Sequence, residues 1–500
     1  MIENLLTGFY VVLTPANLLY CFIGVTIGTL VGVLPGLGPT AAISLLLPIT
    51  FSVTPVSAII LLAGIYYGAQ YGGSTTSILV NIPGEAASIV TCLDGYQMAR
   101  SGRAGPALGI SAMGSFIGGT FGVVGLMLLA PPLADIALKF GPPEYFTLLL
   151  MGLTLLIYLA SGSIPKAFIM AVFGFILAGI GQDQIEGVPR FTFGVMEFMD
   201  GIGLVPVVMG VFGISEVLLN VEQELARVIY ETKIKRLFPN KKDWADSARP
   251  IIRGSLLGFL LGILPGGGAV ISSFVSYALE KRVSKYPEKF GTGVIEGVAG
   301  PETANNSATA GAFVPLLTIG IPSNVVMALL LGALMIHGIT PGPLLMERQP
   351  QLFWGVIASM YLGNAMLLVL NLPLIGLWVK VLKIPYRVLF PLILLFCLIG
   401  VYSLNSSTID MYVMIGSGIF GYLAKKFDYE AAPLALAFVM GPILENSLRQ
   451  SLLMSQGSFL IFVTRPLSAV NLTIVSLLML SPFLPWMKRR REALTESVKG

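Results

Sequence analysis

The sequence predicts an all-α polytopic membrane protein built from two inverted repeats, each with a re-entrant hairpin and a broken helix. Three observations support this fold class. Hydrophobic residues make up 55% of the 500 residues and charged residues 11%, whereas soluble domains carry about 25% charged residues. A segment rich in glycine and proline occurs once in each half of the chain. The two copies have flanks of opposite charge character, which indicates opposite orientations in the membrane.

The repeated segment reads GTLVGVLPGLGPT at 28–40 and GFLLGILPGGGAV at 258–270. The two copies align without a gap, so that Gly28 corresponds to Gly258 and Gly38 to Gly268. Each copy lies in apolar sequence and ends in a Pro-Gly pair, and both residue types interrupt helices. Interruptions at matching positions of two halves are typical of a transporter's binding site. An ordinary kinked membrane helix is the alternative interpretation, and the repetition disfavours it.

The first half begins with residues 16–52, which we interpret as a hairpin that enters the membrane from outside. No lysine or arginine precedes Arg100, so both flanks of this hairpin lack the basic residues that mark cytoplasmic loops. The next apolar segment starts near residue 58, and we expect an unwound polar centre at 71–85 before it resumes as far as Arg100 and Arg103. Further spans are expected near 104–132, 144–160, 166–181 and 200–219.

A basic stretch at 222–254 separates the halves and is expected to be a cytoplasmic linker. The second hairpin, 255–280, has basic residues on both sides, and a second broken segment follows at 294–337. The C-terminal basic run at 488–491 places that end in the cytoplasm as well. We therefore predict about 11–12 membrane elements, with later spans near 352–379, 386–403, 410–423, 431–445 and 466–487. The predicted organisation is a first repeat at 1–221, the linker at 222–254, a second repeat at 255–450, and a C-terminal span with a basic tail at 451–500.

The polar residues inside these apolar segments are the candidate site. A carboxylate in a membrane can be bound by exposed backbone N–H groups and hydroxyls, and cations by carbonyl, hydroxyl and amide oxygens. Hydrogen bonding between helices is the alternative role for each such residue. The predicted substrate and cation set comprises Pro35, Gly36, Gly38, Thr40, Gly73, Ser74, Thr75, Thr76, Asn81, Pro265, Gly266, Gly267, Gly268, Glu302, Asn305, Asn306, Ser307, Thr309, Pro322 and Ser323.

Acidic residues at membrane depth are functional candidates. Glu302 precedes a run of hydroxyl and amide residues and is the best candidate for cation or proton coupling, with Glu85 also of interest. A structural role is expected for Glu216 and Glu445. We expect no catalytic residue and no resident metal or cofactor. The three cysteines show no metal or disulfide spacing, and the chain has a single histidine.

Several long motifs resemble the large membrane subunit of the tripartite tricarboxylate transporters, the TctA family. They cover nearly the whole chain and read GVLPGLGPT, YGGSTTSILVNIPGE, DGYQMARSGRAG, GILPGGGA and GPETANNSATAGAFVPLLTIGIPSN. The resemblance implies a multi-pass permease of the bacterial inner membrane and the elevator-type architecture of the ion-transporter superfamily. It also implies two partners, a small TctB-like membrane subunit and a periplasmic TctC-like binding protein. Transport of an organic di- or tricarboxylate would be driven by a sodium or proton gradient.

Other functional classes are less well supported by the residues. An intramembrane hydrolase would need a Ser/His/Asp set or a metal motif, and neither pattern is evident. An ion channel remains an alternative, although paired broken segments favour alternating access. A stand-alone organic-anion transporter of the same superfamily is a further alternative. The chain has no GxxxxGK[ST] motif, so we expect transport without ATP.

Overall fold

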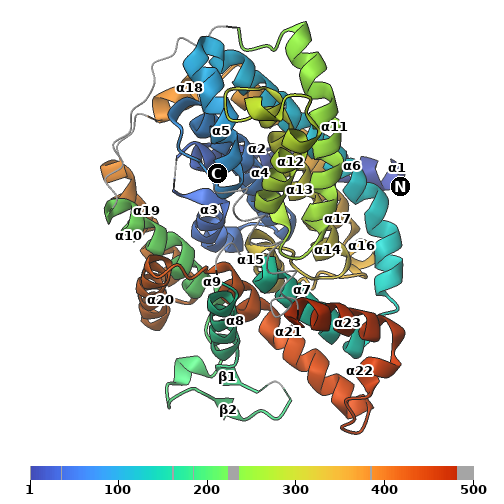
Figure 1. Ribbon diagram of the computed structural model, residues 1–500. Helices are drawn as coiled ribbons and strands as arrows, with labels where there is room; N and C mark the ends of the chain where they lie inside the picture. Colours follow the sequence, from blue (N-terminus) through green and yellow to red (C-terminus); the bar gives the residue numbers. More distant parts are fainter. Residues whose placement is uncertain are drawn as a thin grey trace. The chain divides into compact units, whose positions relative to one another are not determined.

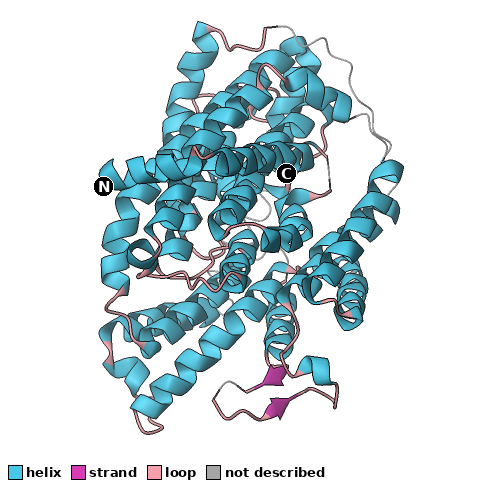
Figure 2. Ribbon diagram, turned by 180° about the vertical axis from the view of Figure 1, so that it is seen from behind, coloured by secondary structure: helices cyan, strands magenta, loops and turns pink. Residues whose placement is uncertain are grey.

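The computed structural model describes residues 2–34, 36–159, 163–183, 185–222, 236–382 and 386–480. Nearly all of the described regular structure is helical, as Figure 2 shows, which confirms the all-α prediction. Five stretches of the described residues are long and apolar enough to cross a membrane: Pro15–Val33, Ala86–Ala137, Pro142–Leu159, Leu204–Glu222 and Pro350–Asn371. Helices suit lipid because they satisfy every backbone polar group internally.

The chain divides into two compact units, and each takes segments from both predicted halves. Unit 1 comprises residues 1–135 and 203–423, and unit 2 comprises residues 136–202 and 424–500. The helices of unit 1 up to residue 222 are α1 (Ile2–Val12), α2 (Pro15–Val33), α3 (Gly38–Leu46), η1 (Leu47–Ser52), α4 (Pro55–Val80), η2 (Ala86–Ser88), α5 (Ile89–Met98), η3 (Ala99–Arg103), α6 (Ala104–Ala137), α9 (Leu204–Val208), η5 (Met209–Ile214) and α10 (Ser215–Glu222).

The remaining helices of unit 1 follow the polar linker, of which residues 223–235 lie outside the described part. They are α11 (Lys241–Ile263), α12 (Gly268–Val283), η6 (Pro287–Lys289), α13 (Glu296–Gly311), α14 (Phe313–Thr318), α15 (Val325–Ile336), α16 (Leu345–Arg348), α17 (Pro350–Asn371), α18 (Ile375–Val381), α19 (Tyr386–Asn405) and α20 (Thr408–Lys426).

The core of unit 1 consists of two buried helices, α4 and α13, each covered by a hairpin. Helix α2 packs along α4, and α11 and α12 pack along α13. Helix α13 in turn contacts α4 and α5, so the two hairpin assemblies share one interior, as the blue and yellow-green helices of Figure 1 show. Nearly every residue of α4 and α13 is buried.

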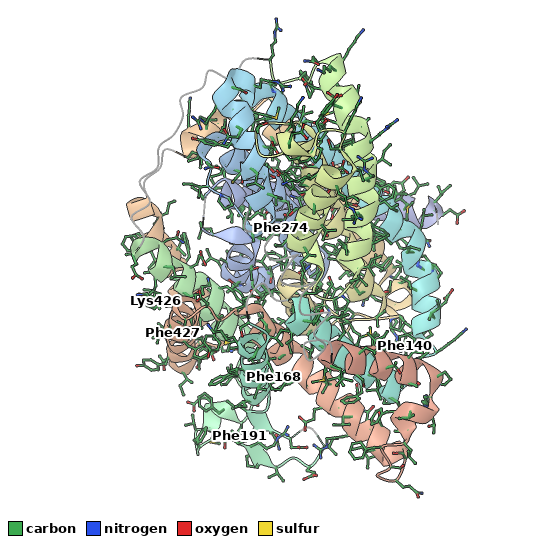
Figure 3. The ribbon with its side chains drawn as sticks, viewed as in Figure 1. Phe140, Phe168, Phe191, Phe274, Lys426 and Phe427 are labelled. Atoms are coloured by element: carbon green, nitrogen blue, oxygen red, sulfur yellow. The ribbon has the colours of Figure 1, made fainter. Side chains whose placement is uncertain are left out.

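Unit 2 holds α7 (Pro142–Leu159), α8 (Ile164–Ala178), η4 (Met196–Phe198), α21 (Ala432–Met454), α22 (Ile461–Thr464) and α23 (Pro466–Leu480). Two short strands, β1 (Gly181–Gln182) and β2 (Pro189–Arg190), pair antiparallel with Gly181 opposite Arg190. Helix α21 packs against α7 and α8, and α23 packs against α7. Figure 3 labels Phe168 on α8 and Phe191 beyond β2, and both side chains are exposed.

An ion-pair network fixes the strand loop of unit 2 to the end of α21. Arg449 contacts Asp183 at 2.6 Å and Glu186 at 2.9 Å, and Arg190 contacts Glu445 at 2.9 Å. The Asp183 carboxylate also accepts hydrogen bonds from two loop amides at 2.8 Å. Glu445 is thus part of a structural network, as the sequence indicated.

Candidate functional site

Both glycine-proline segments form helix–turn–helix hairpins with the same backbone geometry. The first lies between α2 and α3, and the second between α11 and α12. Gly36 and Gly266 have φ of 91° and 80°, a region that non-glycine residues rarely adopt. Gly38 and Gly268 follow with φ of 52° and 49°. The predicted hairpins are therefore confirmed as elements, and Pro35 itself lies outside the described residues.

Each hairpin lies directly against its buried helix through a row of glycines. A Cβ atom added at Gly28 or Gly32 would lie 2.5 or 2.2 Å from the carbonyl oxygens of Ile65 and Ala69. The same contacts recur in the second half, at the corresponding positions of its hairpin and its buried helix. A Cβ atom added at Gly258 would lie 2.2 Å from the carbonyl oxygen of Ala304, and one added at Gly262 would lie 2.2 Å from that of Ala308. The two halves are thus assembled by the same contacts.

Residues 71–80 are helical, which corrects the first part of the unwound centre expected at 71–85, and the polar residues 303–311 of the second broken segment are helical as well. Helix α4 continues to Val80, and α13 to Gly311 with α14 directly after it. The hydroxyls need no partner outside the helix because they donate to backbone carbonyls one turn earlier, for example Ser77 to Gly73 at 3.0 Å and Thr309 to Asn305 at 2.9 Å.

The helices break later, at 81–85 and 319–324. Asn81 has φ of 58° and Gly320 has φ of 81°, and these two residues occupy corresponding positions in the two halves. The next helix of each half begins with a side-chain cap. The Glu85 carboxylate accepts from the Ala87 amide at 2.8 Å, and the Asn324 carbonyl accepts from the Met327 amide at 3.0 Å. Both breaks lie within the predicted segments, the first at the end of the expected centre 71–85 and the second inside 294–337.

The second hairpin tip contacts the second break. The Gly266 amide donates to the Ser323 carbonyl oxygen at 2.8 Å, and a Cβ at Gly268 would lie 3.9 Å from Asn324. In the first half, Thr76 donates to the Val33 carbonyl at 2.6 Å, at the end of α2. The Asn220 side chain of α10 donates to the Gly36 carbonyl at 3.3 Å. Asn220 is a residue that the sequence interpretation missed.

The Glu302 carboxylate is the centre of a buried polar cluster that joins the two halves. Glu302 has 0% exposure and accepts hydrogen bonds from the hydroxyls of Ser74 on α4 and Thr91 on α5. Ser115 of α6 donates to its backbone carbonyl at 3.3 Å. Among the described residues, no lysine, arginine or histidine forms an ion pair with Glu302. Thr91 was not predicted, because its segment carried no repeated motif.

Further polar contacts lie along the buried helices α4 and α13. The Asn324 amide donates to the Tyr66 hydroxyl at 3.2 Å, and Asn306 donates to Asn305 at 2.7 Å. A cavity of about 10 Å³, enough for roughly one water molecule, touches Asn306 and Thr309. Four buried polar atoms near these helices have no hydrogen-bond partner among the described residues: Gln70 Oε1, Glu85 Oε1, Asn305 Nδ2 and Ser323 Oγ.

The other predicted residues have different surroundings. Thr75 is buried in α4, and Thr40 is partly exposed on α3. Ser307 donates to the Ser255 carbonyl of α11 at 2.6 Å, so its hydroxyl holds the hairpin against α13. Pro265 and Gly267 lie in the second tip, and Pro322 is buried in the second break. The structure thus brings the members on α4, α13 and the second tip and break into one region.

Asp94 forms a second buried contact between the halves that the sequence interpretation did not single out. Its carboxylate has 0% exposure and accepts from the amides of Gly291, Gly293 and Val294 at 2.8–3.0 Å. The Tyr277 hydroxyl donates to it at 2.9 Å. Asp94 lies one turn after Thr91 on α5, and the loop it holds leads directly into α13. It therefore fixes the start of the helix that carries Glu302.

Comparison with known proteins identifies the family. Residues 18–436 match the tripartite tricarboxylate transporter TctA family. The chain is 53% identical over 492 residues to an "Uncharacterized 52.8 kDa protein in TAR-I ttuC' 3'region" of Agrobacterium vitis, with 98% of both chains covered. It is also 53% identical over 235 residues to an "Uncharacterized protein in TAR-II ttuC' 3'region" of the same organism, which covers 47% of this chain and 97% of that protein. No solved structure matches the chain significantly. The chain therefore belongs to the tripartite tricarboxylate transporter TctA family.

Proposed function

We propose that this chain is the large permease subunit of a tripartite, cation-driven secondary transporter that imports an organic di- or tricarboxylate. A periplasmic binding protein would deliver the substrate, and a small membrane subunit would complete the complex in the bacterial inner membrane. The observation that carries the proposal is the buried Glu302 cluster between two hairpin assemblies of the same construction. The family assignment agrees with it.

The charge of this cluster favours cation coupling. A buried carboxylate without a basic partner repels an anionic substrate, and an unpaired buried charge is itself unfavourable. A cation that binds together with the substrate offsets both effects. The neighbouring hydroxyls and amides of α4 and α13 supply the oxygen ligands that a hard cation prefers. Backbone N–H groups at the hairpin tips can bind the anion without a permanent positive charge.

An ion pair between two polar segments supports the inverted topology on which alternating access would depend. Arg103 pairs with Asp243, and both lie in segments that the charge bias assigns to the cytoplasm. The contact thus joins two segments predicted on the same face, as inverted repeats require.

Uptake by proteoliposomes tests the proposal. The chain is reconstituted with its small membrane subunit and supplied with the binding protein and labelled citrate, tartrate, malate or succinate. We expect uptake of at least one acid only when the binding protein and an inward sodium or proton gradient are both present. Uptake that persists after the gradient has been collapsed, or that needs ATP, contradicts the proposal. Uptake without the binding protein favours the stand-alone transporter, and gradient-independent conductance favours a channel.

A further inference from the structure

Glu85 and Asn324 occupy matching positions in the two halves of the chain. Each follows a break of the same kind, since NIPGE at 81–85 corresponds to GIPSN at 320–324. Each side chain accepts a hydrogen bond from the first turn of the next helix, at 2.8 Å for Glu85 and 3.0 Å for Asn324. The two positions therefore have the same capping role but differ in chemistry, a carboxyl group in one half and an amide in the other.

The amide of Asn324 makes a second hydrogen bond that Glu85 lacks. Its Nδ2 donates to the Tyr66 hydroxyl on α4 at 3.2 Å. The alignment that pairs Glu85 with Asn324 also pairs Tyr66 with Asn305 on α13. Glu85 Oε1 has no hydrogen-bond partner among the described residues. Glu85 is only 7% exposed and Asn305 is fully buried, so water does not readily replace the missing bond.

The surroundings of Glu85 disfavour a permanent negative charge. The Glu302 carboxylate of α13 acts on Glu85 electrostatically, and the other titratable groups around these two acids are Tyr66 on α4 and Cys92 on α5. The facing residue of α4 is Gly73, whose added Cβ would lie 2.8 Å from the Glu85 side chain. Helix α12 contributes Ser273, which donates to the Ala87 carbonyl at 2.7 Å. Among the described residues, no lysine, arginine or histidine pairs with Glu85.

We propose that Glu85 is a proton-binding site. Its protonated form donates a hydrogen bond to Asn305, in the same way that the Asn324 amide donates to Tyr66. A carboxylic acid has the donor and acceptor set of an amide. One oxygen continues to accept from Ala87, while the protonated Oε1 donates to the side-chain oxygen of Asn305. That oxygen accepts one bond, from Asn306, and has a second lone pair free.

The proton step is a simple transfer. A proton from water adds to the Glu85 carboxylate and forms the O–H bond, and loss of the same proton to water on the other side restores the carboxylate. Binding neutralises one of the two buried negative charges and joins the first break to α13. The use of this step to drive import rests on the proposed function, whereas proton binding itself does not. The two can therefore be tested separately.

Infrared spectroscopy of the purified full-length chain in lipid tests proton binding without any substrate. The pH is varied, and the carbonyl stretch of protonated carboxyl groups is followed in the parent, Glu85→Gln and Glu302→Gln. We expect a pH-dependent band in the parent that is lost in Glu85→Gln and retained in Glu302→Gln. Identical titrating bands in the parent and Glu85→Gln, or no titrating band in the parent, would overturn the proposal.

A second variant keeps the test decisive if Glu85→Gln does not fold. Asn305→Ala removes the proposed acceptor of the protonated form, so the band should titrate at lower pH than in the parent. An unchanged midpoint would overturn the proposal. In proteoliposomes that take up one of the four labelled acids, we further expect uptake to acidify the lumen in the parent and not in Glu85→Gln. A titrating band without any uptake would instead refute the transport function and leave the proton site intact.

Discussion

Ser74 of α4 donates a hydrogen bond to the carboxylate of Glu302 on α13, so that residues 228 positions apart meet in the buried centre of unit 1. This contact joins the two halves of the chain through a charged group. The group is surrounded by hydroxyl donors, with Thr91 as its second partner. Its removal therefore has consequences for both stability and cation dependence.

Glu302→Ala should destabilise the protein and abolish cation-dependent uptake. The hydroxyls of Ser74 and Thr91 would lose their acceptor, and each buried unsatisfied group costs about 1–3 kcal/mol. Glu302→Gln keeps an acceptor oxygen and should fold while losing the dependence on the cation. Thermal unfolding and initial uptake against cation concentration are the measurements, with exposed Glu288→Gln as the control. Parent-like cation dependence in both Glu302 variants would show that this cluster is not the coupling site.

Gly262→Ala should destabilise the second hairpin assembly. The new methyl group would lie 2.2 Å from the Ala308 carbonyl oxygen, so α11 and α13 would have to separate. Overpacking of this kind typically costs about 1–3 kcal/mol. Gly376→Ala is the matched control, because nothing lies within 4 Å of a Cβ at that position. Equal unfolding temperatures of the two variants would contradict the packing described for the glycine rows.

Asp94→Ala should release the loop that precedes α13. Four donors lose a buried carboxylate, and hydrogen bonds to charged groups contribute about 1.5–3 kcal/mol each. Limited proteolysis at Lys289 measures the change, and we expect faster cleavage than in the parent. Asp246→Ala on α11 serves as the control. Cleavage at the parental rate in Asp94→Ala would show that other contacts hold the loop.

The hairpins should be accessible from opposite sides of the membrane. In a background without cysteines, Ser52→Cys lies at the end of η1 and Lys285→Cys lies beyond α12, and both parent residues are exposed. A membrane-impermeant thiol reagent should label position 52 in intact cells and position 285 only after permeabilisation. Labelling of both from one side would refute the inverted repeat.

The contribution of Asp183 to stability should disappear in acid. Two loop amides and Arg449 lower the pKa of Asp183 to about 2, below the value of about 3.9 for an unfolded chain. The stabilisation is therefore fully present above about pH 4 and is lost as the pH falls toward 2. The difference in unfolding temperature between the parent and Asp183→Asn should be constant at neutral pH and shrink below pH 4. Glu186→Gln, at a position with 67% side-chain exposure, should have little effect.

The sequence predicted the elements of unit 1 better than their polar contacts. Hydrophobic composition and the repeated Gly-Pro segment were sufficient for the hairpins, because glycine and proline act locally on the backbone. The expected unwinding at 71–80 was wrong, since hydroxyls such as Ser77 bond within their own helix. Polarity alone does not distinguish a helix that satisfies its side chains from an open loop.

The partners of Glu302 and Asp94 could not be read from local sequence, because they depend on which distant helices meet. One signal was available, however. The alignment of NIPGE with GIPSN pairs Glu85 with Asn324, and thereby indicates where the halves differ in chemistry. The proposed inverted topology and the identity of the bound ions stay predictions.

The glycine rows also determine where the molecule can move. Gly28 and Gly32 contact the backbone of α4 directly, because neither residue has a side chain that would separate the two helices. A slide of α2 along α4 by less than a full helical turn would drive backbone atoms into one another. Gly258 and Gly262 impose the same restriction on α11 and α13. Each hairpin and its buried helix therefore move together. Any opening of the site toward water has to occur between other helices.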